Sequence, residues 1–257
     1  MSVENYLEGM EEEKRKFILS AITFENFETK VINPARFDVM QLSNIPSQGD
    51  QKTTQSKYLS IAGTTTPALC TITGSVKFSK LFNPPPLTNT KTEKSILKKV
   101  ITINPIPQEF ERYIACIGKA LGINHFDFAL YQGGVSIGTM TEQSGMSRFM
   151  GKDEPQQPNG RKPVVMSNVR SGFMKSGSTS GMWIRPFSDT VPVADLSNNL
   201  AFNFGSDFDE FKGRTDMNDA PVNAMVMVLH TVNAWRGKEG FNPWSISLNV
   251  ISVLVLP

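Results

Sequence analysis

The segment "APVNAMVMVLHTVNAW", residues 220–235, decides the fold, because it is apolar on both faces of an extended strand. Successive side chains of a strand point to opposite faces of the sheet. One face would carry Val222, Ala224, Val226 and Val228, and the other Met225, Met227 and Leu229. A strand with two apolar faces must be covered on both sides, so this segment is predicted to be a central strand of a layered structure.

The segment "WSISLNVISVLVLP", residues 244–257, predicts a second long strand. It begins by alternating Trp244, Ile246 and Leu248 with serine and asparagine, and it then becomes apolar throughout. Alternation is typical of a strand with one polar face, whereas a continuous apolar run indicates burial on both faces. We therefore expect two long core strands in this part of the sequence.

Shorter strands precede these two segments. Residues 68–82 and 96–106 alternate as strands do, and residues 125–141 are typical of a hairpin whose turn is Gly133–Gly134. Long runs of strand separated by turn residues indicate a mainly β fold. The predicted class is an antiparallel sandwich or a jelly-roll-like arrangement.

Two helices are predicted beside the strands. Apolar residues recur at helical spacing from about residue 107 to 121, where Pro107 suits the first turn and Gly122 the end. Near the N-terminus, Glu11–Glu13 precede Lys14–Lys16 in an amphipathic pattern that favours a helix. We expect a helical arm over 1–30 and one β-rich domain over 31–257, with a flexible basic loop region at about 142–182 that is rich in Gly, Ser, Pro and Gln.

The composition excludes several classes of protein. Of 257 residues, 39% are hydrophobic and 19% charged, which argues against global disorder. The net charge is only +2, so only a local patch could attract nucleic acid. The two cysteines cannot form a disulfide framework, and with two scattered histidines they do not have zinc-site spacing. No metal and no cofactor is predicted.

No targeting or membrane segment is predicted. The first residues carry no apolar signal region, and no stretch reaches the ~18 uninterrupted apolar residues of a membrane span. The protein is therefore expected to be soluble and intracellular, with a virion as a further location.

The carboxylates in "FNFGSDFDEF", residues 202–211, are the main candidates for metal chemistry. On an extended chain Asp207 and Asp209 would lie on one side, and hard cations such as Mg²⁺ prefer oxygen ligands. The neighbouring turn formers and counter-charges favour a solvated loop held to the core by Phe204, Phe208 and Phe211. No nucleophile elbow or phosphate-binding loop is present, so the chain is predicted not to be an enzyme and to have no catalytic residues.

A basic segment with interleaved aromatic residues is the candidate binding site. Cations neutralise phosphates and aromatic rings stack on unpaired bases, which is how proteins bind single-stranded nucleic acid. The alternative is a solvated loop without function. The candidate nucleic-acid-binding residues are Arg148, Lys152, Arg161, Lys162, Arg170, Lys175, Arg185, Phe173 and Trp183.

These observations predict a non-enzymatic, self-assembling viral-type structural protein, a capsid protein or nucleoprotein, whose basic loop contacts nucleic acid. Its partners would be copies of itself and single-stranded nucleic acid such as RNA. One alternative is a single-stranded nucleic-acid-binding protein of the viral movement type. Another is a metal-dependent enzyme that uses the Asp207/Asp209 loop.

Overall fold

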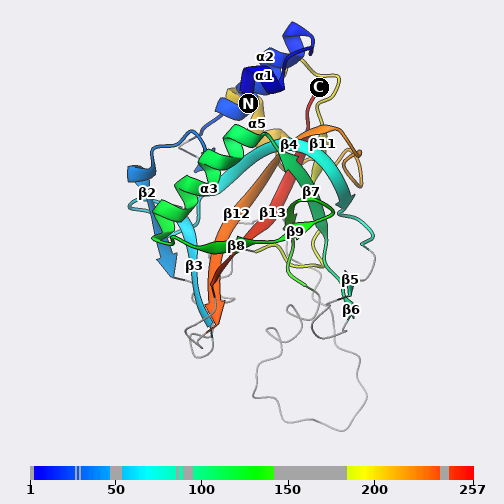
Figure 1. Ribbon diagram of the computed structural model, residues 1–257. Helices are drawn as coiled ribbons and strands as arrows, with labels where there is room; N and C mark the ends of the chain where they lie inside the picture. Colours follow the sequence, from blue (N-terminus) through cyan, green and yellow to red (C-terminus); the bar gives the residue numbers. More distant parts are fainter. Residues whose placement is uncertain are drawn as a thin grey trace.

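The fold is described from a computed structural model of the chain (Figure 1). The structure describes residues 3–26, 28, 30–46, 54–84, 87–88, 95–141, 184–237 and 243–257. Most of the regular structure in these ranges is β, in one eleven-stranded mixed sheet, which confirms a mainly β protein. Long connections join strands that lie far apart in the sequence, and four helices pack around the sheet.

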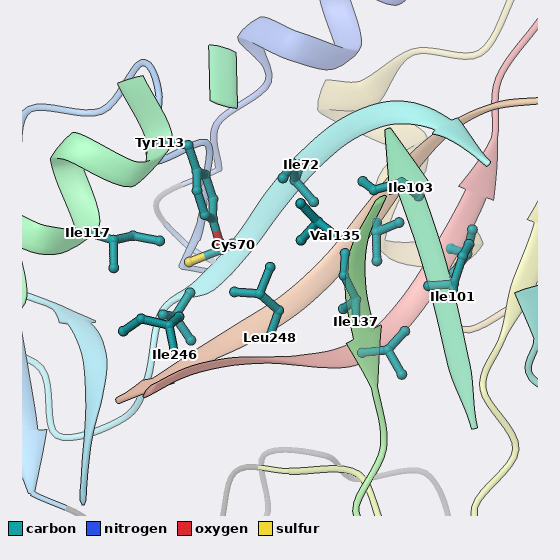
Figure 2. Close-up of a cluster of buried hydrophobic side chains, with 14 of the residues drawn as sticks. Cys70, Ile72, Ile101, Ile103, Tyr113, Ile117, Val135, Ile137, Ile246 and Leu248 are labelled. Atoms are coloured by element: carbon teal, nitrogen blue, oxygen red, sulfur yellow. The ribbon is translucent and has the colours of Figure 1, made fainter. Parts of the chain in front are cut away.

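Five strands form a closed ring. They are β4 (Leu69–Lys80), β7 (Val100–Pro105), β10 (Gly134–Gly138), β13 (Trp244–Val255) and β12 (Met225–Gly237). Each is hydrogen-bonded to the next in this order, and β12 pairs with β4 to close the ring. The ring encloses the main hydrophobic core, and Figure 2 shows side chains from its strands and from one helix meeting there.

The expected antiparallel sheet is corrected to a mixed one. The four pairings that involve β4, β7 or β12 within the ring are antiparallel, but β10 pairs with β13 in parallel, from Ile137↔Leu248 to Gly138↔Asn249. Parallel neighbours need a long crossover connection. Residues 139–243 supply one here, so β10 and β13 can run side by side in the same direction.

From Met225 on, strand β12 has the two covered faces that the sequence predicts, whereas Val222 precedes the strand and is exposed. Val226 and Val228 lie in the core inside the ring, whereas Met225, Met227 and Leu229 lie in a second cluster outside it. Helices α1 (Val3–Tyr6), α2 (Glu12–Thr23) and α5 (Phe204–Phe211) cover this second cluster near both chain ends (Figure 1). The two-faced apolar pattern therefore reflects two hydrophobic layers that share one strand.

Further strands extend the ring at its margins. Beyond its pairing with β4, β12 pairs with β3 (Thr54–Ile61). Strand β3 in turn pairs with the edge strand β2 (Leu42–Pro46). The short parallel additions are β1 (Val31–Ile32) on β4, and β8 (Phe126–Phe128) and β11 (Val193–Asp195) on β13. Strands β5 (Leu87–Thr88) and β6 (Ser95–Ile96) form a separate ribbon.

Helix α3 (Pro107–Leu121) is confirmed with both of its predicted ends. Pro107 occupies the first turn, and Gly122 ends the helix at φ +62°, a left-handed conformation that favours glycine. Tyr113, Ile117 and Leu121 point from α3 into the core of the ring, and the first two are visible in Figure 2.

The N-terminal helix is interrupted. The amphipathic pattern predicts continuous helix, but α1 ends at Tyr6 and α2 begins at Glu12 because Gly9 takes φ +89°. Val3, Leu7, Phe17 and Ile18 are nevertheless buried in the second cluster. The division into an arm over 1–30 and a domain over 31–257 stays a prediction.

The turn of the predicted hairpin is displaced by one residue. Strand β9 (Leu130–Tyr131) pairs with β10 through Tyr131↔Gly134, so the turn residues are Gln132 and Gly133, both at positive φ. Gly134 instead lies in the strand, where an added Cβ would come within 2.5 Å of the Ile103 carbonyl oxygen. The second glycine is therefore required for close strand packing rather than for the turn.

A search of the described helices finds none that is long and apolar enough to cross a membrane.

Candidate nucleic-acid interface

Most of the predicted nucleic-acid-binding residues lie outside the described part of the chain. These are Arg148, Lys152, Arg161, Lys162, Arg170, Phe173, Lys175 and Trp183, and the predicted flexible loop region at about 142–182 lies outside it too. Their proposed role stays a prediction. Arg185 is described, and it lies where the chain returns to the ring.

Arg185 is tied to the protein backbone. Its Nη1 donates to the Thr190 carbonyl oxygen at 3.0 Å and its Nη2 to the Ile251 carbonyl oxygen at 2.9 Å. Burial lowers the pKa of its guanidinium, and the nearby Asp189 partly offsets this effect. The side chain thus fastens residues 184–190 to the outer side of β13.

Lys99 lies next to Arg185, where β7 begins and β10 ends. The Lys99 ammonium donates to the Asp189 carbonyl oxygen at 2.7 Å and lies 5.6 Å from the centre of the Phe187 ring. Burial is the main cause that lowers the pKa of Lys99. The Asp189 carboxylate raises this pKa and the Arg185 guanidinium lowers it, so the charges of Lys99, Asp189 and Arg185 interact. We call Lys99 and Arg185 the cation corner. Lys98 precedes Lys99, and its side chain lies beside Gly138 of β10.

A second group of cations and aromatic rings lies at the loop end of the β12–β13 hairpin. The Lys57 ammonium and the Arg236 guanidinium each lie 4.7 Å from the centre of the Trp244 indole, within cation–π range. Lys57 also donates to the Leu121 carbonyl oxygen at the end of α3. Burial is the main cause that lowers the pKa of Lys57, and Arg236 lowers it further.

Trp235 lies on the opposite face of β12 and is open to solvent. Its register partners are Ser56 and Ser245, whereas Lys57 pairs with the buried Ala234 on the other face. The Trp235 side chain is 43% exposed, and its indole N–H donates to Ser247 Oγ at 3.0 Å. This hydrogen bond holds an exposed aromatic ring against the neighbouring strand, on the face opposite to Arg236.

Analysis of the sequence alone missed this hairpin group. Trp235 and Trp244 stand at the two sides of one predicted turn with Arg236 between them, and this spacing is the signal that could have located the group. Lys57 had no such signal, because only the pairing of β3 with β12 brings it to Trp244.

The prediction that the carboxylates of residues 202–211 lie in a solvated loop is wrong, because residues 204–211 form helix α5. Phe204, Phe208 and Phe211 follow the helical repeat and pack into the second cluster, so they do hold the segment to the core as expected. The Asn203 side chain caps the helix by accepting from the Gly205 N–H at 2.8 Å.

In α5 the acidic side chains diverge. Residues two positions apart in an α-helix lie about 200° apart around its axis, so Asp207 and Asp209 do not lie on one side. Asp207 accepts from the Asn203 N–H at 2.9 Å and from Ser206 Oγ at 2.6 Å, whereas Asp209 pairs with Lys212 at 2.5 Å. Within the described ranges no group of His, Cys, Asp or Glu has the geometry to hold a metal ion.

His230 and Tyr113 form a buried polar pair that is also accounted for by its partners. The His230 Nδ1–H donates to the Val228 carbonyl oxygen at 3.1 Å, so Nε2 accepts from the Tyr113 hydroxyl at 2.5 Å. Burial lowers the pKa of His230 to about 4 and raises that of Tyr113, so both side chains are neutral near pH 7. Cys70 is buried nearby with a raised pKa, which makes it an inert core thiol.

Comparisons with known proteins identify no relative: no family model, no curated protein and no solved structure matches the chain.

Proposed function

We propose that the protein is a non-enzymatic, viral-type nucleoprotein that assembles with copies of itself and binds single-stranded nucleic acid. The observation that carries the proposal is the exposed Trp235, held by Ser247 at the loop end of β12–β13, with Lys57 and Arg236 on the opposite face of the same hairpin. An exposed indole suits stacking on an unpaired base, and a strand that passes around the end of the hairpin could bring its phosphates to the cations on the other face. A duplex hides its base faces, so this group favours single strands.

The strand order supports the same proposal by analogy. The order β4–β7–β10–β13–β12, closed by β12 on β4, resembles the OB-fold, a five-stranded ring whose loops between strands 1 and 2 and between strands 4 and 5 bind oligonucleotides. The hairpin group borders the second of these loops, and the cation corner borders the end of the first. A fold supports many functions, so the analogy adds to the argument from Trp235 and cannot replace it.

Self-assembly is the second half of the proposal. Strand β2 is the last strand on its side of the sheet among the described residues, and an edge strand offers backbone groups to another chain. If the protein is a capsid protein, we propose that the domain is a sandwich or jelly-roll-like unit, which suits a closed shell. The movement-type alternative requires nucleic-acid binding without closed particles. The alternative of a metal-dependent enzyme is not favoured, because the acidic side chains of α5 diverge.

The binding test uses a fluorescent single-stranded oligonucleotide titrated at several salt concentrations. Wild-type affinity should fall with salt, and Trp235→Ala should weaken binding by about 1–3 kcal/mol, or roughly 5- to 150-fold, with little change in the salt dependence. Met40→Ala is the control, because Met40 is an exposed apolar residue far from the hairpin in the sequence. Absence of salt-dependent binding by the wild type at low ionic strength would refute the proposal.

A further inference from the structure

We propose that Phe78 and Tyr131 form a second base-stacking platform for single-stranded nucleic acid, on the outer face of the sheet where β4, β7, β10 and β9 lie in order. The class of ligand rests on the proposed function. The platform itself is separate from Trp235, which belongs to the β12–β13 hairpin, so the two sites can be tested independently.

A β-bulge turns Phe78 away from the core. Val76 lies in the core inside the ring, and strict alternation would place Phe78, two residues later, on the same face. The register of β4 against β7 shifts between Val76 and Phe78, so Lys77 is an extra residue in the strand. After the bulge the inward position falls to Leu81, which lies in the core, and Phe78 points outward.

Tyr131 reaches the same outer face from β9. It pairs in register with Gly134, and the next residue of β10, Val135, lies in the core, so Tyr131 and Gly134 share the outer face. The Phe78 and Tyr131 rings lie 5.2 Å apart, centre to centre, at 71°. Aromatic rings favour this edge-to-face arrangement. Both side chains are half-buried and hold each other in place, so stacking on a base would require little further ordering.

The two rings meet over small residues of the intervening strands β7 and β10. Phe78 pairs in register with Thr102, and a Cβ added to Gly134 would lie 2.8 Å from Thr102 Cγ2. Thr102 is fully buried, and across the part of the chain that the structure describes its hydroxyl has no hydrogen-bond partner. Burying a hydroxyl without a partner costs free energy, and such local costs are typical of functional sites.

The charge beside the rings suits a polyanion. Lys77 at the bulge is exposed, and so is Lys80, which lies two residues after Phe78 and therefore on the same face of β4. Aromatic rings with neighbouring cations suit bases that stack and phosphates that are neutralised. A second copy docked here by two-fold symmetry would instead bring the same lysines together, and like charges oppose such an interface.

The first experiment titrates a fluorescent single-stranded oligonucleotide at several salt concentrations. Phe78→Ala and Tyr131→Ala should each weaken binding about 5- to 150-fold, with little change in the salt dependence. Phe78→Leu keeps an apolar side chain but has no aromatic face, so it should fold normally and still weaken binding. Leu130→Ala is the matched control, because Leu130 is the exposed neighbour of Tyr131 on the other face of β9, and it should bind like wild type.

The second experiment tests the cation beside the rings. Lys80→Gln should flatten the log–log dependence of affinity on salt by about 0.7, whereas Lys119→Gln, which removes an exposed lysine of α3, should leave the slope unchanged. An unchanged slope in Lys80→Gln would overturn the phosphate contact at this platform.

The failure of the platform and that of the proposed function give different results. If the wild type binds and Trp235→Ala weakens binding, but the ring variants bind like Leu130→Ala, the platform is refuted while the proposed function stands. If the wild type does not bind, both are refuted. A smaller assembly of Phe78→Leu by light scattering, with unchanged affinity for the oligonucleotide, would show that this face contacts protein and would also overturn the platform.

Discussion

At the scale of single residues, burial rather than residue type determines which ionisable groups are available for chemistry. His230 and Tyr113 satisfy each other inside the ring, and Cys70 lies beside them in an apolar environment. Lys98, beside Gly138 of β10, also has its pKa lowered by burial. The sequence correctly indicated that His230 belongs to the core, since it interrupts an apolar run, but it could not indicate that Tyr113 is its partner.

His230 should make the stability depend on pH. Its pKa falls from 6.5 to about 4 on folding, so between these values the unfolded chain holds a proton that the folded protein lacks. The free energy of unfolding should therefore fall as the pH is lowered from 6.5 to 4, by about 3 kcal/mol from this group. Urea unfolding at a series of pH values measures this dependence of the free energy of unfolding.

The control for this prediction is His230→Gln, which removes the titrating group. This variant should be less stable than wild type at pH 7, but its free energy of unfolding should change less between pH 6.5 and pH 4. An equal pH dependence in the two proteins would show that other groups cause the acid sensitivity.

At the scale of elements, the segments with explicit end signals were predictable and those without were not. Helix α3 has a proline at its start and a glycine at its end, so both bounds follow from the sequence. Helix α5 was mistaken for a loop because glycine and two aspartates obscure the helical spacing of its phenylalanines. Gly9 breaks the N-terminal helix through a backbone conformation that an amphipathic pattern does not record.

Helix α5 should depend on its phenylalanines and not on its carboxylates. Phe208 is buried and lies 4.6 Å, ring centre to ring centre, from Phe24, so Phe208→Ala should cost about 3–5 kcal/mol of stability. The triple change of Asp207 and Asp209 to Asn and Glu210 to Gln should cost less, since Asp209 and Glu210 are exposed and the hydrogen bonds of Asp207 at the start of the helix contribute about 1 kcal/mol. Denaturant unfolding compares the variants. Loss of tight Mg²⁺ or Mn²⁺ binding in the triple variant would contradict this assignment.

Strand β13 should be indispensable. Its last residues pair with β12 on one side and β11 on the other, and the residues from 252 to 256 are buried. Each buried valine or leucine contributes about 1.5–3 kcal/mol, against a total stability of roughly 5–15 kcal/mol. Deleting residues 252–257 should therefore yield an aggregated or unfolded protein by circular dichroism. A soluble truncation with a cooperative melt would instead show that this strand is dispensable.

At the scale of the whole molecule, the mainly β class was predictable but the closed ring was not. Apolar periodicity shows that a strand has a covered face, yet it does not show which strand covers it. The closing contact joins residues 70–75 to residues 225–230, and the parallel pair joins β10 to β13. Neither pairing leaves a local signal, which is also why the sheet was expected to be antiparallel.

Assembly and nucleic-acid content should be measurable together. With a net charge of only +2, the protein should bind nucleic acid through local patches, so bound material should be released by moderate salt. Size-exclusion chromatography with light scattering should give a mass above one chain, with an absorbance ratio that reveals nucleic acid at low salt. Closed particles by negative-stain microscopy would favour the capsid form, and a monomer at all concentrations would contradict self-assembly.

The contact between β4 and β12 also has a consequence during protein synthesis. The strands of the ring that are made early, β4, β7 and β10, have to wait until β12 and β13 emerge from the ribosome before the core can be enclosed. Pairing between such distant segments is slow, and open strand edges are prone to aggregate while they wait. We therefore expect the nascent chain to need a chaperone, and its yield in a cell-free system to rise when one is supplied.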